Sequence, residues 1–450
     1  MSKEIALKNN KDRRVLIMGL GLNQGGVGAA KYFALHGWRV IVTDLKSESE
    51  LKPSLQTLSN LGQIKFILGQ HREKDFINTD LVIASPAVPP DNKYIQIARQ
   101  HQIPVFCPMA YFFAHKRGLT VGVTGTKGKS TTTNLLYQIL KRAGKKVLLA
   151  GNIGISVFEI LDQTDQDTIS VLEVSNLMLE WMQLEKQSPE IAVITNIFPD
   201  HLNRHKTMAE YIAVKKSIFQ FPANRIVFLN QNNPITQKLL KEAEAKAVGY
   251  RVANLDLQIP EVDQFHPLAG THNQENIAAA AAVAQYLGIN QSVIQETVRR
   301  YQGLYGRQMY LGQINGVDII NDTCATTPDA VVAALRRFAS RKIILLTGGT
   351  DKNLDYRPLA QQLYYQPPKA MIVLQGSGST KLKQLLISPK PTWPIFWEAK
   401  NLDVAIKQAL DLAQPGDLLL FSPGGSSFEL FANEFDRGKK FESFIKNTLK

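Results

Sequence analysis

The chain has 450 residues, 44% of them hydrophobic, and its 52 Lys and Arg outnumber its 39 Asp and Glu, giving a formal charge of +13. This length is too great for one hydrophobic core and predicts about three domains. The positive charges are dispersed, without the arginine-rich and aromatic runs of nucleic-acid-binding proteins. We therefore expect no nucleic-acid partner and favour either a polyanionic small substrate, such as a nucleotide sugar, or plain solubility as the reason for the positive charge.

The sequence predicts a soluble, cytoplasmic protein without a membrane partner, and we expect a monomer. The apolar stretch at 15–22 is interrupted by glycines and is too short for a signal peptide or a membrane span. Cys107 and Cys324 are the two cysteines of the chain, which excludes a disulfide framework and fits a reducing compartment.

The first region, residues 1–113, alternates short apolar strands with helical stretches, which is typical of a parallel sheet. The turn after the first strand resembles a dinucleotide-binding fingerprint but has Gln24 in place of the third glycine. Asp44 ends the second strand, where an acidic residue can meet a ribose hydroxyl. We predict a Rossmann-like domain with a nucleotide-shaped pocket and only weak support for NAD.

The second region, residues 114–302, opens on the segment 124–132, TGTKGKSTT, between an apolar strand and a helical run. A glycine-rich turn in this position presents backbone N–H groups to an anion. Lys129 adds a fixed positive charge, and the Ser130 hydroxyl can ligate magnesium. A purely structural turn is the alternative, but the pattern favours a nucleotide-phosphate site. It departs from the standard P-loop, which has a glycine where this chain has Val123.

Two further strands of this region end in residues suited to a metal–triphosphate site. Glu173 follows the strand at 169–172, and Asp200 and His201 follow the strand at 191–195. Because the carboxyl ends of parallel strands share one edge of a sheet, these side chains should converge on the phosphate loop. A solvated strand-end carboxylate is the alternative for Glu173, and a magnesium ligand is favoured beside the loop.

A helix that begins near residue 207 carries Lys215 within an apolar stripe. Its ammonium either extends to water or reaches the metal site, and a bare ammonium would repel magnesium unless it were modified. Asn273 and Asn276 share one face at the start of a later helix. They could hydrogen-bond a base or ribose, or one of them could be an N-cap.

The third region, residues 303–450, repeats the pattern with strands at 342–346, 371–374 and 418–421. Asp322 closes a strand at 317–320, and glycine-rich loops follow two other strands. The predicted fold is therefore α/β with three domains in series, namely a Rossmann-like N-terminal domain, a central ATP-binding domain with a mostly parallel sheet, and a Rossmann-like C-terminal domain.

Taken together, the sequence resembles the Mur ligase family across nearly the whole chain. The blocks that carry the likeness, in order, are GTKGKSTTT, EVSN, TNIFPDH, AVKKSIF, GTHNQEN, NDTCATTPDA, GGTDKNLD and FSPGGSSFELFANEFDRG. The resemblance implies an ATP-dependent ligase that adds glutamate, with D-glutamate favoured, to UDP-N-acetylmuramoyl-L-alanine through an acyl phosphate. It assigns residues 1–113 to UDP-sugar binding, 114–302 to ATP and 303–450 to the amino acid.

The resemblance also implies roles for individual residues. Those expected around ATP are Gly125, Thr126, Lys127, Gly128, Lys129, Ser130, Thr131, Asn273, Asn276, Arg307 and Asp322. Two Mg²⁺ ions would be held by Ser130 and Glu173 and by His201 with Lys215 as its carbamate, so that Lys129, Glu173, His201 and Lys215 form the catalytic set. Those expected along the UDP-sugar are Thr43, Asp44, Ser85 and Asn152. Those expected around the amino acid are Thr326, Lys352, Ser422 and Phe428.

Several positions depart from the family pattern. Cys324 stands where these ligases usually carry a lysine, Gly306 replaces a histidine, and Met309 replaces a glutamate. The identity of the added amino acid therefore stays open between D-glutamate, L-glutamate and another amino acid. A nucleotide-binding relative without ligase activity and a Rossmann dehydrogenase are the alternatives. The first is disfavoured by the presence of Glu173, His201 and Lys215, and the second by the Gln24 substitution and the later phosphate loop.

Overall fold

The structure, a computed structural model, describes residues 13–21, 25–62, 64–200, 202–243, 246–251, 266–351, 354–388, 391–427, 430–431 and 433–448. The chain forms two compact units, one holding strands β1–β11 and the other β12–β17. Among the described residues, no helix is both long enough and apolar enough to cross a membrane.

The N-terminal sheet has five parallel strands in the order β3-β2-β1-β4-β5, as a Rossmann-like fold requires. Its strands are β1 (Arg14–Met18), β2 (Arg39–Asp44), β3 (Ile64–Leu68), β4 (Leu81–Ala84) and β5 (Val105–Phe106). The helices between and after them are α1 (Gly25–Leu35), α2 (Glu48–Leu58), α3 (Glu73–Ile77), α4 (Lys93–Gln100) and α5 (Pro108–His115).

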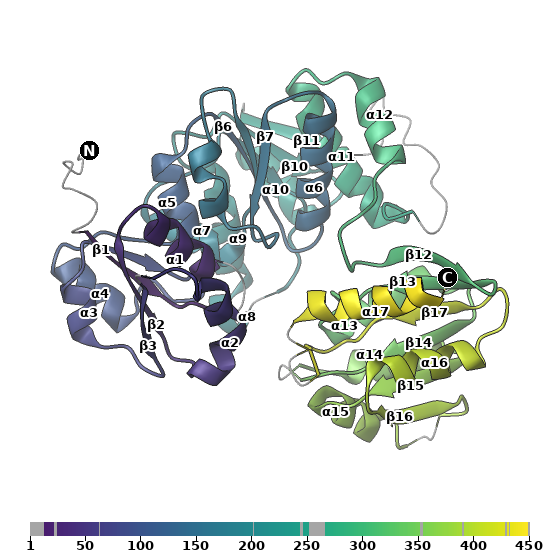
Figure 1. The fold of residues 1–450 in the computed structure, drawn as a ribbon. Coiled ribbons are helices and arrows are strands. Elements are labelled where there is room, and N and C mark those ends of the chain that lie inside the picture. The colour runs from purple at the N-terminus through teal and green to yellow at the C-terminus, as the bar shows by residue number, and fades with distance from the viewer. Residues whose placement is uncertain are drawn as a thin grey trace. The chain divides into compact units, whose positions relative to one another are not determined.

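The central sheet has six parallel strands in the order β11-β10-β9-β6-β8-β7. Strands β6, β7, β10 and β11 of this sheet are labelled in Figure 1. Its strands are β6 (Leu119–Thr124), β7 (Val147–Gly151), β8 (Ile169–Glu173), β9 (Ile191–Ile194), β10 (Ile226–Asn230) and β11 (Ala247–Tyr250). The α-helices are α6 (Lys129–Arg142), α7 (Asn176–Leu184), α8 (Leu202–His205), α9 (Met208–Lys216), α10 (Pro234–Glu242), α11 (Thr271–Tyr286) and α12 (Gln291–Arg299). Short 3-10 helices are η2 (Val157–Glu159), η3 (Leu161–Gln163) and η4 (Ser217–Phe219).

The C-terminal sheet has the order β12-β13-β17-β14-β15-β16, and its edge strand β12 is antiparallel to β13 while the other strands are parallel. Its strands are β12 (Met309–Ile314), β13 (Val317–Asn321), β14 (Ile343–Thr347), β15 (Ala370–Leu374), β16 (Ile395–Ala399) and β17 (Leu418–Phe421). Its helices are α13 (Pro328–Arg337), α14 (Arg357–Tyr365), α15 (Ser377–Leu385), α16 (Leu402–Leu412) and α17 (Glu434–Thr448).

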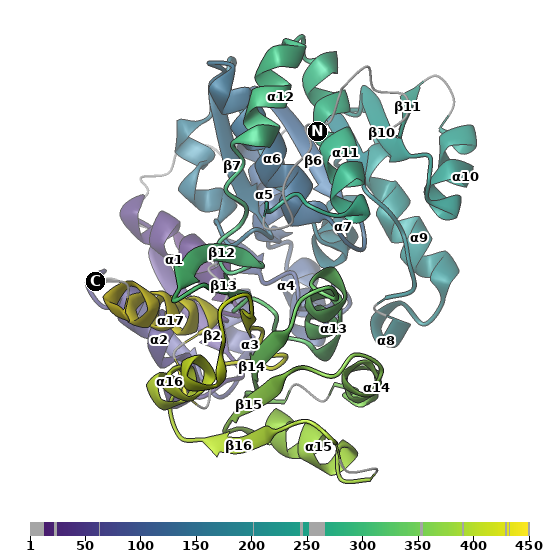
Figure 2. The same cartoon turned by 90° about the vertical axis from the view of Figure 1, so that its right-hand side faces the viewer.

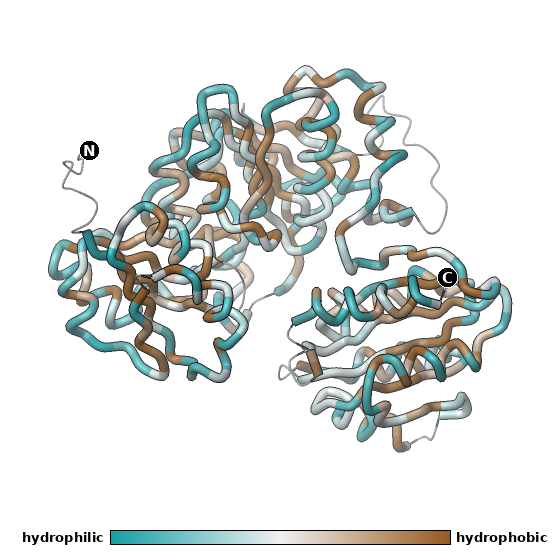
Figure 3. Tube along the Cα trace, viewed as in Figure 1, coloured by the Kyte–Doolittle hydropathy of each residue, from teal (hydrophilic) through white to brown (hydrophobic). Residues whose placement is uncertain are grey.

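The strands of the C-terminal sheet are continuous apolar runs because helices cover both faces of this sheet. Helices α13, α14 and α15 pack on one face and α16 and α17 on the other, as Figure 2 shows. Every residue of β13, β14, β15 and β17 is therefore buried. In Figure 3 the hydrophobic segments likewise follow the strands, and the hydrophilic ones follow loops and outer helix faces.

The predicted fold class is confirmed, with three α/β domains in series and one sheet in each of the three predicted regions. The boundaries after residues 113 and 302 stay predictions. In the central sheet, β6 lies between β8 and β9. The loop that leaves β6 therefore lies between the ends of the strands that lead to Glu173 and Thr195.

Candidate functional site

The phosphate loop runs from the end of β6 to the start of α6, and its shape requires two glycines. Gly125 and Gly128 have φ angles of +147° and +82°. A Cβ on Gly128 would lie 2.2 Å from Asn276 Oδ1, and one on Gly125 would lie 1.9 Å from Thr195 Oγ1. The N-cap residue of α6 is Gly128, and no described side chain caps this helix. Its first N–H groups can therefore bind an anion.

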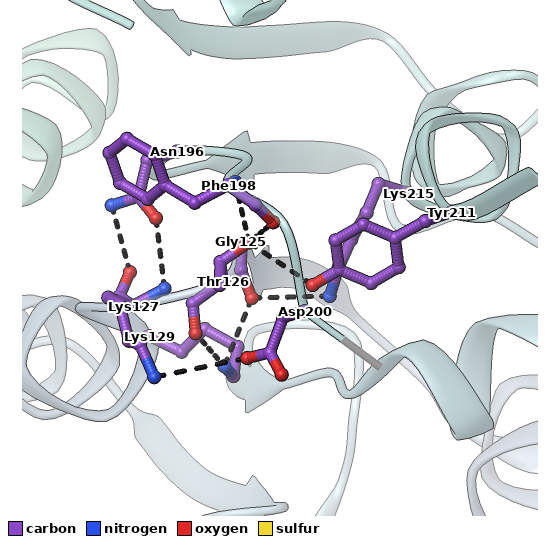
Figure 4. A network of polar contacts seen from close by, with 9 residues as sticks. All are labelled: Gly125, Thr126, Lys127, Lys129, Asn196, Phe198, Asp200, Tyr211 and Lys215. Atoms are coloured by element: carbon purple, nitrogen blue, oxygen red, sulfur yellow. Dashed lines mark hydrogen bonds and ion pairs between the residues drawn. The ribbon is translucent and has the colours of Figure 1, made fainter. Parts of the chain in front are cut away.

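The segment after β9 holds the loop in place. Asn196 accepts a hydrogen bond from Lys127 N at 2.9 Å and donates one to Lys127 O at 3.1 Å. Thr195 Oγ1 also donates to Lys127 O at 2.6 Å, and Phe198 N donates to Thr126 Oγ1 at 3.0 Å. Figure 4 shows most of this network. We did not predict Asn196 as a site residue, although its place after a strand next to β6 could have identified it.

Lys129 lies across the loop that precedes it. Its Nζ donates to Gly125 O at 3.0 Å and to Thr126 O at 2.9 Å (Figure 4). Ser130 and Thr131 follow in the first turn of α6, and both are half-buried. The ammonium is therefore held where phosphate oxygens would approach the loop and the helix N-terminus.

Lys215 points inward from α9 and is 1% exposed, so of the two orientations predicted for it the structure has the buried one. Its Nζ donates to Thr124 Oγ1 at 3.0 Å and to Gly125 O at 3.2 Å. Burial holds the pKa of Lys215 well below its usual value and the charge of Lys129 lowers it further, whereas Asp200 and Glu173 act in the opposite direction. The Tyr211 ring lies 5.4 Å from the Lys215 Nζ.

Glu173, the last residue of β8, is 1% exposed and pairs in register with Val123 of β6. Its Oε1 accepts a hydrogen bond from Asn152 Nδ2 at 2.8 Å. Its Oε2 is buried and has no hydrogen-bond partner among the residues that the structure describes. Asn152, expected along the UDP-sugar, is thus hydrogen-bonded to the carboxylate expected to hold magnesium. A buried carboxylate oxygen without a partner is unfavourable unless a cation or a donor meets it.

His201 lies outside the described residues, but the segments on either side of it are described. Asp200 lies 3.9 Å from Lys127 Nζ. His205, at the end of α8, is buried, and its Nε2 lies 2.8 Å from Asn176 Nδ2 of α7. The segment after β9 is therefore attached to the phosphate loop at its start and to α7 at its end.

Asn273 and Asn276 lie inside α11, which begins at Thr271, so neither is the N-cap of this helix. Both side chains are buried. Asn276 Nδ2 donates to Asn273 Oδ1 at 3.0 Å, and Thr132 Oγ1 of α6 donates to Asn276 Oδ1 at 3.4 Å. The N-capping alternative is wrong, and the pair packs against the phosphate loop.

Three of the residues predicted along the UDP-sugar, Thr43, Asp44 and Ser85, lie at the carboxyl edge of the N-terminal sheet. Asp44 accepts hydrogen bonds from Gly21 N at 3.1 Å and Lys46 N at 2.9 Å. The fully buried Thr43 hydroxyl donates to Gln70 O at 3.0 Å. Ser85 follows β4, and its Cβ would lie 2.9 Å from a Cβ on Gly19. The strands thus bring these three residues to one edge, with the Thr43 hydroxyl turned inward. Gln24 lies outside the described residues.

In the C-terminal unit, Asp322 and Ser422 meet at the ends of the neighbouring strands β13 and β17. Ser422 Oγ donates to Asp322 Oδ2 at 2.8 Å. Burial raises the pKa of Asp322 to about 7, although Ser422, the Gln308 N–H and the positive charge of Arg307 act to lower it. Thr326 lies in the turn after Asp322, where its N–H donates to Cys324 O. Lys352 and Phe428 lie outside the described residues.

Arg437 of α17 is a buried residue that we did not predict. It donates to Thr323 O at 2.7 Å and to Gly425 O at 3.2 Å, and so connects the loops after β13 and β17. Burial lowers the pKa of its guanidinium to about 10. Arg437 falls within a block that carried the family resemblance, but no spacing in the sequence indicates that its side chain is buried.

Two departures from the family pattern lie in contact. Gly306 has a φ of +65°, and a Cβ there would lie 2.5 Å from Thr323 Cγ2 and 3.1 Å from Cys324 Sγ. Cys324 N donates to Gly306 O at 2.8 Å. A histidine at position 306 would therefore displace the loop that carries Cys324.

Three family models match successive parts of the chain. They are the Mur ligase MurD-like N-terminal domain at residues 13–107, the Mur ligase middle domain at 123–284 and the Mur ligase glutamate ligase domain at 306–425. A solved UDP-N-acetylmuramate-alanine ligase from Thermotoga maritima has the same fold. Its TM-score is 0.62 at 19% identity, and the match covers 97% of this chain and 99% of that one.

Curated relatives match at higher identity. A protein of Roseiflexus sp. (strain RS-1) named UDP-N-acetylmuramoylalanine–D-glutamate ligase is 37% identical over 97% of this chain and 98% of its own length. A protein of Borreliella afzelii (strain PKo) with the same name is 34% identical with the same coverage. On these matches, and with the three sheets and the phosphate loop in the predicted order, the chain belongs to the Mur ligase family.

Proposed function

We propose that this chain is an ATP-dependent amide ligase that adds D-glutamate to UDP-N-acetylmuramoyl-L-alanine during peptidoglycan precursor synthesis. The curated relatives named for this reaction match nearly the full length of the chain. The observation that carries the proposal is the phosphate loop with two buried groups at its side. Lys215 is hydrogen-bonded to Gly125 O, and Glu173 lies on the strand next to β6.

The reaction begins with a carboxylate that is too poor an electrophile for an amine to attack. An oxygen of the substrate carboxylate attacks the γ-phosphorus of ATP, and the bond to ADP breaks, which leaves an acyl phosphate. The glutamate amine then attacks the acyl carbon, loses a proton, and the tetrahedral intermediate expels phosphate. Lys129 stabilises the negative charge on the transferred phosphoryl group, together with the N–H groups at the start of α6.

The residues of the site fit magnesium. Glu173 Oε2 is a buried oxygen with no partner in the described part of the chain, and a hard cation would satisfy it. No group of three or more His, Cys, Asp or Glu that could hold a metal occurs among the described residues. Magnesium is usually bound through one or two carboxylates plus phosphate oxygens. Magnesium would neutralise charge on the phosphates. We propose one site at Ser130 and Glu173 and a second at His201 and Lys215.

The second site requires Lys215 as a carbamate. Its lowered pKa supports this modification, because only the neutral amine attacks carbon dioxide. The nitrogen forms a bond to the carbon, one proton leaves, and the product is an anionic oxygen ligand. Lys215→Ala should lose activity and regain part of it with added acetate or formate. Full activity in the variant, or loss without any rescue, would contradict the carbamate.

Further residues would bind the three substrates. Asn273, Asn276, Arg307 and Asp322 would hold the nucleotide, and Thr43, Asp44, Ser85 and Asn152 the UDP-sugar. Thr326, Lys352 and Phe428 would surround the amino acid, where the resemblance also suggested Ser422. The D configuration rests on the names of the relatives, since Cys324 stands where a lysine is usual near this end of the site.

The test combines purified protein, UDP-N-acetylmuramoyl-L-alanine, ATP and one amino acid at a time, with released phosphate as the readout. We expect release with D-glutamate and not with L-glutamate. Lys129→Ala should abolish it, whereas Lys145→Ala, an exposed lysine just beyond the same helix, should not. Nucleotide binding without phosphate release for any amino acid would favour the non-catalytic relative instead.

We also propose that the protein acts as a monomer in the cytoplasm, where ATP and nucleotide-sugar substrates are available. Sedimentation velocity across a concentration series tests the monomer. A sedimentation coefficient that rises with concentration to the value of a dimer would refute it.

A further inference from the structure

The ends of strands β13 and β17 bring two buried polar side chains together. Asn321 and Phe421 pair in register as the last residues of the two strands, so that Asp322 and Ser422 follow at the same level. Asp322 N donates to Phe421 O at 2.8 Å, and the Ser422 hydroxyl donates to Asp322 Oδ2 at 2.8 Å. Ser422 is 0% exposed and Asp322 is 5% exposed. The contact is therefore part of the framework at the end of the sheet.

Asp322 keeps hydrogen-bonding capacity beyond this contact. Its Oδ1 accepts a hydrogen bond from Gln308 N at 3.1 Å. A carboxylate oxygen has two acceptor positions, so each oxygen of Asp322 can accept one more hydrogen bond. The Ser422 hydroxyl has a single proton, and it is directed at Asp322. An enclosed hydroxyl whose proton is used in this way is poorly placed to donate to a substrate carboxylate.

A second hydroxyl holds the same loop without touching Asp322. Thr347 Oγ1, at the end of β14, donates to Pro423 O at 2.9 Å and is also buried. Ser422 and Thr347 thus differ in one respect that matters, because only Ser422 is bonded to the Asp322 carboxylate. A comparison of variants at these two residues therefore distinguishes an effect on the position of the loop from an effect on the orientation of the Asp322 carboxylate.

We propose that Ser422 is a positioning residue for the nucleotide, acting through Asp322, and not a ligand of the amino acid. Its hydroxyl orients the Asp322 carboxylate so that the remaining acceptor positions receive the ribose hydroxyls of ATP. The inference rests on the proposed function in one respect, since it takes from it that Asp322 meets the nucleotide. It replaces the amino-acid role that the sequence suggests for Ser422.

The charge of Asp322 adds a pH signature. Burial raises the pKa of Asp322 to about 7, and the Ser422 hydroxyl lowers it because it stabilises the carboxylate. The other groups acting on this carboxyl are Arg307, Arg337, Arg437 and Cys324. The arginines stay cationic near neutral pH, and burial raises the pKa of the Cys324 thiol to about 11. Nucleotide affinity should therefore weaken as pH falls through about 7, when Asp322 takes up a proton.

The experiment compares Ser422→Ala with Thr347→Val and measures KM for ATP, KM for glutamate and the dissociation constant of ADP by calorimetry. For Ser422→Ala we expect a rise of about tenfold in KM for ATP and in the ADP constant, the effect of losing a hydrogen bond to a charged group, with little change in KM for glutamate. The pH midpoint of ADP binding should move upward, because a donor to the carboxylate has been removed. Thr347→Val should leave the ADP constant within about twofold of wild type.

Asp322→Asn completes a double-mutant cycle. If Ser422 acts through Asp322, the loss in the double variant should be close to that of Asp322→Asn alone. Asp322→Asn should also abolish the pH dependence of ADP binding near 7. Should the alanine variant not fold, Ser422→Cys, which keeps the size and a weak donor, is measured in the same way and should show the same changes at smaller amplitude.

Three results would overturn the inference. They are a rise in KM for glutamate with unchanged ADP binding, equal effects of Ser422→Ala and Thr347→Val, and additive losses in the cycle. Failure of the proposed function looks different. In that case wild-type protein would release no phosphate with any amino acid, while ADP binding would still depend on Ser422 and pH.

Discussion

A comparison of Gly128→Ala with the control Gly144→Ala should separate the free-energy cost of a strained backbone from the disruption of the nucleotide site. The φ angles are +82° at Gly128 and +73° at Gly144. An alanine in this left-handed region costs roughly 1–2 kcal/mol at either position. Only at Gly128 does the added methyl meet another group, since Asn276 Oδ1 would lie 2.2 Å away and nothing lies within 4 Å at Gly144.

The additional cost at Gly128 follows from the contacts that Asn276 would lose. Its side chain accepts from Thr132 Oγ1 at 3.4 Å and donates to Asn273 Oδ1 at 3.0 Å. Each hydrogen bond contributes roughly 0.5–1.5 kcal/mol. We therefore expect the free energy of unfolding to fall by about 2–5 kcal/mol in Gly128→Ala and by about 1–2 kcal/mol in Gly144→Ala.

Urea denaturation measures the stability difference, and a fluorescent ATP analogue measures affinity. Gly144→Ala should bind the analogue within about twofold of wild type, and Gly128→Ala should bind at least about tenfold more weakly, because Asn276 and the loop must move apart. Equal loss of stability in both variants with unchanged affinity in both would show that Asn276 has room to move, and would refute the reasoning.

Three further variants or reactions test other contacts. Asn152→Asp replaces the amide that donates to Glu173 Oε1 at 2.8 Å by a second carboxylate. Loss of the hydrogen bond and like-charge repulsion should lower the free energy of unfolding in urea by about 1–3 kcal/mol at pH 7, and unchanged stability would contradict this. Cys324, with its pKa raised to about 11, should react with iodoacetamide about 100-fold more slowly than an ordinary thiol at pH 8; equal rates would argue against burial. Arg437→Met should lower the free energy of unfolding by about 2–4 kcal/mol and exposed Lys439→Met by less than about 0.5 kcal/mol; similar losses would exclude a role for the Thr323 and Gly425 contacts.

Much of the arrangement could be predicted because parallel strands are buried on both faces and end at one edge. The predicted strand at 81–84 coincides with β4, and the one at 418–421 coincides with β17. The phosphate loop lies between a strand and a helix as its pattern indicated, and Glu173 ends the neighbouring strand. Hydrophobic periodicity and glycine placement are local properties, and they were sufficient for these features.

The directions of polar side chains were decided only by the tertiary structure. For Lys215 the sequence left open an outward ammonium or a buried amine, and the contact with Thr124 and Gly125 selects the buried one. Asn152 is bonded to Glu173, and Ser422 to Asp322, across more than 20 residues of chain in each case. No spacing rule predicts such contacts, because they depend on which strands become neighbours and on which hydroxyl or amide meets a buried carboxylate.

By itself, the sequence determined the fold class, the order of the three domains and the position of the phosphate loop, since these follow from local patterns and from the family blocks. Only the tertiary structure showed which buried groups form hydrogen bonds or pack against one another. Within the described ranges Glu173 Oε2 is left without a partner, Arg437 connects two loops, and Gly306 makes room for Cys324. The physical reason is that a buried polar group is stable only with a partner, and that partner usually comes from a distant part of the chain.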